Sequence, residues 1–220
     1  MRSLRFALLA TVLAASTAFA SPTDPKNGVE YVTLAQPQSV QTTGKKVEVI
    51  EFFMYHCPHC NAFEPQLEQW VKKQGGNIQF KRIHLPFSGP NDPEAHLYLT
   101  LEAMGKSEEF QPKVFKAWHV DHLRLNTDAA ILDWVAKNGI DRNKFQNVWS
   151  SFGVITKLHR LPQIATDYKV DGVPTIIIDG KYQTAPSIVY NSVKSSSEPV
   201  LFQATLQVMD ALVAKAAKSK

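Results

Sequence analysis

The chain has 220 residues, 44% of them hydrophobic and 20% charged, with a formal net charge of +4. This size and apolar content allow a buried core without crosslinks. No basic run is interleaved with aromatic residues, which argues against a nucleic-acid partner. The two cysteines are separated by only two residues, and a bridge closing so short a ring restricts the unfolded chain little. The pair is therefore unlike the staples of disulfide-stabilised secreted proteins.

The first predicted element is a secretory signal peptide at residues 1–20, MRSLRFALLATVLAASTAFA. Arg2 and Arg5 supply a positive start, an apolar run follows, and Ala18-Phe19-Ala20 has the small-x-small form of a cleavage site. The run is shorter than the ~20 residues that a transmembrane helix needs. We expect cleavage after Ala20, export, and a soluble mature protein, because no later segment has an uninterrupted apolar run of that length.

The next elements predict one half of an α/β sheet. EYVTL at 30–34 suits a short strand, and KVEVIEFFMY at 46–55 is apolar on both faces, as in the central strand of a covered sheet. NAFEPQLEQWVKKQGG at 61–76 has helical spacing and ends at two glycines, and NIQFKRIHL at 77–85 resembles another strand. The order strand, helix, strand predicts a right-handed βαβ unit.

The second half of the chain begins with helical periodicity and returns to strands. Asp92 and Pro93 form a good N-cap and first-turn pair, and the helical pattern continues to about residue 167. GVPTIIIDGKYQ at 172–183 predicts a hairpin, followed by a C-terminal helix capped by serine. We expect an α/β domain formed by residues 21–87 and 168–220, with an all-helical domain at 88–167 inserted between its halves.

The motif Cys57-Pro58-His59-Cys60 lies between the expected central strand and the following helix. Proline favours the first helical position, which makes Cys57 the N-cap. Its sulfur then faces the free N–H groups of the first turn at the positive end of the helix dipole, and these groups stabilise a thiolate. His59 adds positive charge when protonated. We expect Cys57 to be the nucleophile and the more covered Cys60 to be the resolving thiol.

Other uses of two cysteines are less well supported. A haem attachment site requires histidine directly after the second cysteine, and position 61 is asparagine. A structural zinc site needs four ligands, and the chain has no second cysteine pair, although His119 and His122 lie near each other in sequence. We therefore expect no metal and no cofactor beyond a redox-active Cys57–Cys60 disulfide. A zinc site and an inert bridge remain the alternatives.

These motifs together resemble the DsbA family of periplasmic thiol:disulfide interchange proteins. The similarity rests on CPHC, with EFF six residues ahead of it and FE just after it, and on GVPT before a hairpin, and it spans nearly all of the chain after residue 20. It implies a thioredoxin fold, a central mixed β-sheet flanked by helices, with an inserted helical domain. It also implies a monomer that oxidises reduced, unfolded exported proteins and is reoxidised by a DsbB-type quinone reductase of the inner membrane.

The resemblance also assigns supporting residues. Val173 and Pro174 match a loop that holds a cis proline beside the cysteines and docks substrate, although X-Pro bonds are usually trans. Glu51 and Glu64 match acids beneath the active site, and Arg82 stands where the family often has lysine. Arginine stays charged and can bind both acids at once.

Three further positions match a groove of the family, and two residues differ from the family pattern. Phe63, Gln183 and Pro186 match the edge of a groove that receives substrates and the membrane partner, although Phe63 could equally belong to the core. His56 replaces a familiar aromatic residue, and Pro65 could kink the active-site helix.

Two other functions compete with a disulfide oxidase. One is a disulfide isomerase or reductase, which usually needs a dimerisation domain or a reducing partner. The other is a metal- or peptide-binding chaperone without redox chemistry.

Overall fold

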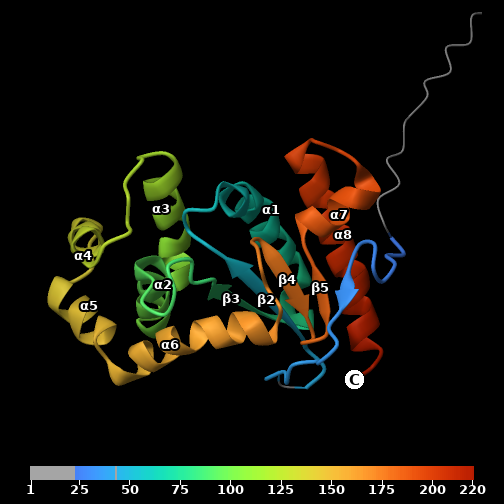
Figure 1. Ribbon diagram of the computed structural model, residues 1–220, viewed down its shortest axis with the longest axis horizontal. Helices are drawn as coiled ribbons and strands as arrows, with labels where there is room; N and C mark the ends of the chain where they lie inside the picture. Colours follow the sequence, from blue (N-terminus) through green and yellow to red (C-terminus); the bar gives the residue numbers. More distant parts are fainter. Residues whose placement is uncertain (1–22, 43) are drawn as a thin grey trace, which may run out of the picture.

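The computed structural model describes residues 23–42 and 44–220, so the expected signal peptide and its cleavage site lie outside the described residues (Figure 1). The described chain forms a mixed sheet flanked by helices, with a group of helices to one side (Figure 1). This is the α/β thioredoxin fold with a helical insertion that the sequence predicts.

The sheet has five strands in the order β1-β5-β4-β2-β3. Their bounds are β1 Val32–Thr33, β2 Val47–Phe53, β3 Ile78–His84, β4 Thr175–Ile178 and β5 Tyr182–Thr184. β2 and β3 are parallel, and the other pairs are antiparallel. All seven residues of β2 are buried, as expected for a strand covered on both faces. The first strand is shorter than the segment 30–34 suggests.

Helices α1 and α8 cover one face of the sheet. α1 spans Pro58–Gln74, followed by a short 3₁₀ turn at Gly75–Asn77, and α8 spans Glu198–Ala217. Apolar residues of α1 pack against α8 and the sheet, and Phe63 contacts Phe202 with ring centroids 5.0 Å apart. The opposite face packs against Tyr168 and Val170, which follow helix α6. The central strand is thus buried between two apolar clusters.

The inserted helices lie between β3 and β4. They are α2 Pro93–Ala103, α3 Ser107–His119, α4 Asp128–Lys137, α5 Arg142–Trp149 and α6 Phe152–Asp167. Asp92 caps α2 as predicted, because its carboxylate accepts from the Ala95 N–H at 2.8 Å. The core of these helices is continuous with the end of β2 and includes Phe53, Cys57 and Cys60. The insert therefore shares its core with the cysteine motif.

The C-terminal region differs from expectation in two ways. A helix that the sequence reading did not anticipate, α7 at Pro186–Val193, lies between the hairpin and α8. Ser197 occupies the N-cap of α8 as expected, but its side chain makes no capping hydrogen bond.

α8 is also long and apolar enough to cross a membrane by length and composition, although Asp210 interrupts its apolar run. Half of that segment is buried within the protein, against α1 and the sheet. This packing accounts for its apolar character.

Candidate active site

Cys57 lies at the N-cap of α1, directly after a tight turn at the end of β2. Pro58 is the first helical residue, which its fixed φ favours. The Cys60 N–H donates to Cys57 Sγ over 3.3 Å, and both cysteines are free thiols in this structure. The local sequence therefore produces the cap that was predicted: a sulfur in place of the usual capping oxygen.

The two thiols have opposite electrostatic surroundings. Hydrogen bonding from the Cys60 side chain, helped by the N–H groups of Cys60 and His59 and by the His59 charge, lowers the pKa of Cys57 to about 6 despite partial burial. Burial, the hydrogen bond to Cys57 and the Cys57 charge raise the pKa of Cys60 far above its usual range. One thiol is thus prepared to ionise, and the other keeps its proton.

The Val173-Pro174 loop lies against Cys57. Its peptide bond is cis. The Cys57 thiol donates to the Val173 carbonyl oxygen, with 3.7 Å between sulfur and oxygen. The structure therefore places the loop beside Cys57, as the resemblance implies, and leaves backbone groups next to the sulfur.

A buried charge cluster lies beneath the cysteines. Arg82 donates through Nε to Glu51 at 2.9 Å and through Nη2 to Glu64 at 2.7 Å, so the arginine binds both acids as expected. Its remaining nitrogen, Nη1, donates to Glu108 at 3.1 Å. Glu108 lies in the first turn of α3, so the cluster joins the sheet, α1 and the insert.

The two buried acids in this cluster, Glu51 and Glu64, have raised pKa values. Burial raises the pKa of Glu51 to about 7 and that of Glu64 to about 8, although Arg82 opposes both shifts. One oxygen of each carboxyl group, Oε1 of Glu51 and Oε2 of Glu64, is buried without a hydrogen-bond partner among the described residues. These oxygens are places where a proton can reside near Cys60.

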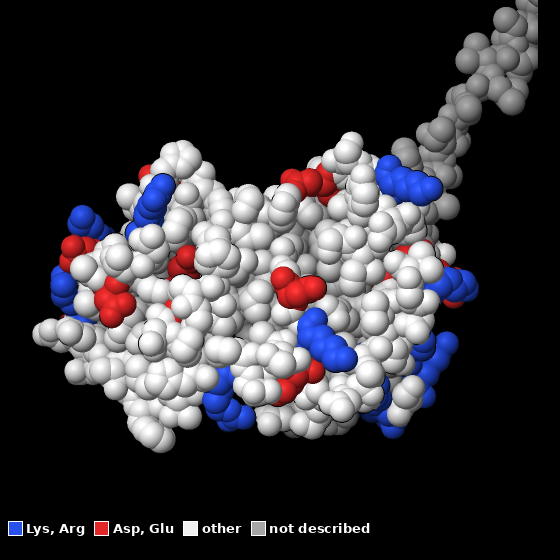
Figure 2. Space-filling view, viewed as in Figure 1, with Lys and Arg blue, Asp and Glu red and all other residues white. Residues whose placement is uncertain are grey.

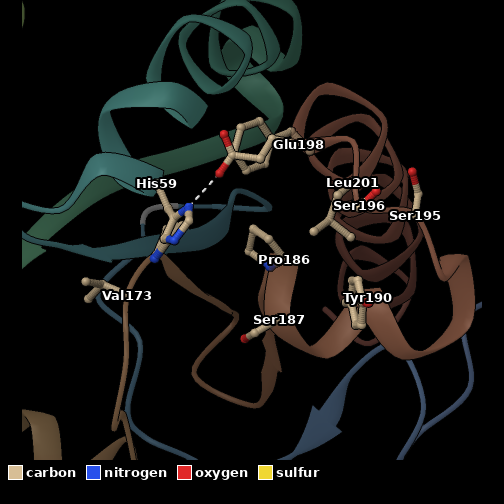
Figure 3. A pocket seen from close by; sticks show the side chains of 11 residues that line it. His59, Val173, Pro186, Ser187, Tyr190, Ser195, Ser196, Glu198 and Leu201 are labelled. Carbon is tan, nitrogen blue, oxygen red and sulfur yellow. Dashed lines mark hydrogen bonds and ion pairs between the residues drawn. The ribbon is translucent and has the colours of Figure 1, made fainter.

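A pocket of about 360 Å³ opens beside the cysteine motif (Figure 3). It lies between the start of α1, the cis-proline loop, α7 and the start of α8, and its labelled lining includes His59, Val173, Pro186, Tyr190 and Leu201 (Figure 3). His59 Nδ1 lies 2.5 Å from Glu198 Oε1, across the pocket's edge. This exposed pair joins the active-site helix to the C-terminal helix.

The three groove positions taken from the resemblance have different outcomes. Pro186 lines the pocket at the start of α7. Gln183 lies in β5, paired with Val32 and Ile177, and is not among the pocket's lining residues. The groove position of Phe63 is wrong: its side chain is 0% exposed and packs in the core against Phe202, since it lies on the inward face of α1.

Several side chains near the motif were not anticipated. None of Glu94, Glu108, Glu198 and His84 was singled out from the sequence, and His119 was considered only as a zinc ligand with His122. The helical pattern after Pro93 was the only signal near Glu94, and it gave no direction for that side chain. Among the described residues, no three His, Cys, Asp or Glu side chains are placed to hold a metal ion.

Charge on the surface is mixed. Figure 2 shows Lys, Arg, Asp and Glu singly or in small groups of both signs, and the face between α3 and α7 is mainly uncharged.

A CxxC pair at the start of the helix after the central strand of a thioredoxin fold, next to a cis-proline loop, defines a thiol:disulfide oxidoreductase. A family model described as DSBA-like thioredoxin domain matches residues 93–192. The chain belongs to the DsbA family of thiol:disulfide interchange proteins, as its similarity to curated members shows.

Individual relatives extend this likeness over most of the chain. The DsbA protein of Burkholderia cepacia is 41% identical over 206 residues, covering 94% of this chain and 92% of the relative. That of Bordetella bronchiseptica is 36% identical over 211 residues, covering 96% of each. The crystal structure of Pseudomonas aeruginosa DsbA superimposes with a TM-score of 0.77 at 34% identity, covering 90% of this chain and 98% of that one.

Proposed function

We propose that this protein is a disulfide oxidase that donates its Cys57–Cys60 disulfide to cysteine pairs of other proteins. A substrate thiolate attacks Cys57 Sγ, and a mixed disulfide forms while Cys60 leaves with the electron pair and takes up a proton. The second thiol of the substrate, deprotonated, then attacks the substrate sulfur of the mixed disulfide. Cys57 leaves as a thiolate, and the substrate departs oxidised by two electrons.

The observation that carries this direction of transfer is the position of Cys57 Sγ at the start of α1, where it accepts from the Cys60 N–H. The surroundings that lower the pKa of Cys57 to about 6 stabilise the reduced protein. A stabilised reduced form makes the disulfide a stronger oxidant, and a thiolate of low pKa is a good leaving group. Both effects favour release of oxidised substrate.

The buried acids have a supporting role in this proposal. Cys60 keeps a proton once reduced, because its pKa is raised by burial. The unpaired carboxyl oxygens of Glu51 and Glu64 can deliver and accept that proton, with Arg82 balancing the remaining charge. The cluster thus keeps the interior close to neutral as Cys60 changes state.

Substrate docking in this proposal uses the loop and the pocket. The backbone of Val173 lies next to Cys57 Sγ and offers hydrogen-bonding groups to an extended peptide. The pocket lined by Pro186, Tyr190 and Leu201 accepts apolar side chains next to the reacting cysteine. Such contacts recognise unfolded chains with little demand on sequence.

The proposed clients are reduced, unfolded exported proteins, and the proposed compartment is the periplasm. The supports are the signal-like residues 1–20 and membership of the DsbA family. Reoxidation is assigned to a DsbB-type quinone reductase of the inner membrane, with the protein acting as a monomer and without a metal or organic cofactor.

Equilibration of the protein with a series of reduced-to-oxidised glutathione ratios, followed by mixing with a reduced, unfolded two-cysteine substrate, tests the proposal. We expect stoichiometric oxidation of the substrate and reduction of Cys57–Cys60. A protein that reduces or reshuffles disulfides but does not oxidise the substrate would be an isomerase or reductase. A variant with both cysteines replaced by serine should bind the substrate without oxidising it. If the protein were a chaperone without redox chemistry, the parent and this variant would both bind the substrate and neither would oxidise it.

A further inference from the structure

The turn that delivers Cys57 to α1 is held by side chains from elsewhere. Met54 to Cys57 form a tight turn in which the Cys57 N–H donates to the Met54 carbonyl oxygen at 3.2 Å. The peptide groups of Tyr55 and His56, in the middle of the turn, belong neither to the β2 ladder nor to α1. Buried backbone groups of this kind require partners.

Three side chains supply those partners. The Tyr55 N–H donates to His84 Nε2 at 3.2 Å, and the His56 N–H donates to Glu94 Oε2 at 3.0 Å. His119 Nε2 lies 2.8 Å from the Tyr55 carbonyl oxygen, to which it must donate. His84 is the last residue of β3, Glu94 lies in the first turn of α2, and His119 ends α3. Two of the three supports therefore come from the insert.

The chemistry of His84 agrees with its role as an acceptor. Because its Nε2 accepts a hydrogen bond from a backbone N–H, the ring must be neutral at that nitrogen. Its side chain is completely buried, and burial lowers its pKa to about 4. The ring therefore stays an acceptor for the Tyr55 N–H throughout the neutral range.

Glu94 makes the most contacts with the turn. In addition to the backbone bond, its Oε1 lies 2.8 Å from His56 Nδ1, so one carboxylate holds both the backbone and the ring of the residue before Cys57. Glu94 is 5% exposed. The other titratable groups around it are His84, whose Nε2 is 3.9 Å away, and Asp92, whose carboxylate binds the N–H groups of its own loop and helix start.

We propose that Glu94 is a positioning residue for the redox reaction: from the helical insert it fixes the His56 peptide and thereby the place of Cys57 Sγ against the start of α1. The inference rests on the proposed role of Cys57 as the nucleophile. Cys57 follows His56 directly, so a change in the His56 peptide plane moves the Cys57 backbone. The sulfur then loses its alignment with the Cys60 N–H, which is 3.3 Å away.

The proposal separates placement from charge. Glu94→Gln keeps an oxygen that can accept from the His56 N–H and an amide that can donate to the ring, but it removes the charge. Glu94→Asp keeps the charge but withdraws the carboxylate by one methylene group. Glu94→Ala removes both. Glu102→Ala is the matched control, because Glu102 lies on the same helix and pairs with Lys157 at the surface, at 2.8 Å.

Thiolate absorbance against pH and a glutathione redox titration are measured for the parent and each variant, together with urea unfolding of both redox forms. In Glu94→Ala, Cys57 should titrate about one pH unit higher, and the disulfide should be about tenfold harder to reduce, equivalent to about 30 mV. Glu94→Asp should shift in the same direction by less. Glu94→Gln and Glu102→Ala should keep the Cys57 titration and the redox equilibrium of the parent. If Glu94→Ala does not fold, the shift in Glu94→Asp tests the proposal in its place.

Two results overturn the proposal. One is a Glu94→Ala protein in which both redox forms lose the same stability while Cys57 titrates as in the parent. That result would make Glu94 a structural residue only. The other is an equal shift in Glu94→Gln and Glu94→Ala, which would show that charge acts rather than placement. In either case the parent still oxidises the two-cysteine substrate, whereas failure of the proposed function would show as an inactive parent.

Discussion

The Glu51 carboxylate and the Arg82 guanidinium form a buried ion pair, with 2.9 Å between Oε2 and Nε. Glu64, also buried, shares the same guanidinium. One arginine faces two buried acids, and burial raises the pKa of both carboxyl groups, so the two acids titrate as a coupled pair. The raised pKa of these two carboxyl groups makes the stability of the folded protein depend on pH.

Glu51→Gln should stabilise the reduced protein at pH 8. A carboxyl whose pKa is raised, from 4.5 to about 7, binds its proton more tightly in the folded state, so stability falls as pH rises through this interval. The variant removes this loss, a gain of at most ~3 kcal/mol at pH 8, and should differ little from the parent at pH 5. Urea unfolding at both pH values measures the effect.

A matched control for Glu51→Gln is Glu109→Gln, which removes an exposed acid that pairs with Lys106 and Lys113. In this variant the free energy of unfolding should change between pH 5 and pH 8 by the same amount as in the parent. A Glu51→Gln protein less stable than the parent at pH 8 would show that the charged pair is a net stabiliser.

Cys60→Ala should accumulate mixed disulfides with exported proteins, and Cys57→Ala should accumulate none. Cys57 carries the lowered pKa, whereas Cys60 is 0% exposed and out of reach of a macromolecule. Non-reducing gels of cell extracts, with and without a reductant, measure the trapped species. Equal trapping by both variants would refute the assignment of nucleophile and resolving thiol.

His59→Ser should move the Cys57 titration to higher pH and make the disulfide harder to reduce. The His59 charge is one of the smaller causes of the lowered pKa of Cys57, after the Cys60 hydrogen bonds. We therefore expect less than the tenfold effect that ~30 mV represents. Thiolate absorbance against pH and a glutathione titration measure both quantities.

Glu198→Gln is the companion variant, because it leaves His59 in place but removes the carboxylate 2.5 Å from its ring. The Cys57 titration should move in the same direction as in His59→Ser, because this contact holds the imidazole at the start of α1. An unchanged titration in His59→Ser would mean that the helix start alone sets the chemistry.

Tyr190→Ser should weaken the use of apolar peptide substrates without changing the redox equilibrium. Tyr190 is 48% exposed and lines the pocket beside His59, where it offers an aromatic surface. We expect KM to rise by about tenfold, equivalent to ~1.4 kcal/mol of binding. Peptide oxidation kinetics and a glutathione titration separate the two properties.

The control for Tyr190→Ser is Phe152→Ser, which removes a more exposed aromatic residue, 86% exposed, at the start of α6 and outside the pocket. It should leave KM unchanged. A similar rise in KM for both variants would point to general surface hydrophobicity rather than to the pocket.

Local rules predicted much of the active site because each part depends on neighbouring residues. The cap at Cys57 follows from the proline after it, and the burial of β2 follows from its unbroken apolar run. Arg82 was expected to contact Glu51 and Glu64 because a resemblance placed them together, and its planar nitrogens allow both contacts.

Contacts that join distant segments were missed wherever the family resemblance did not already place the two residues together. Glu94 and His56 are 38 positions apart, and His59 and Glu198 are 139 apart, so no periodicity or spacing connects them. The same limit explains Phe63. Its helical face was evident, but only the packing of α8 decided that this face lies in the core. α7 was missed because its eight residues follow a strand without a capping side chain.

The insertion points of the helical domain lie on both sides of β2, where it ends. The last residue of β3, His84, pairs with Phe53, and the first residue of β4, Thr175, pairs with Phe52. Any graft, truncation or loop exchange at these junctions therefore changes the walls around Cys57 as well as the outline of the molecule. A protein engineer who replaces this domain to alter client choice should expect the redox potential to change with it.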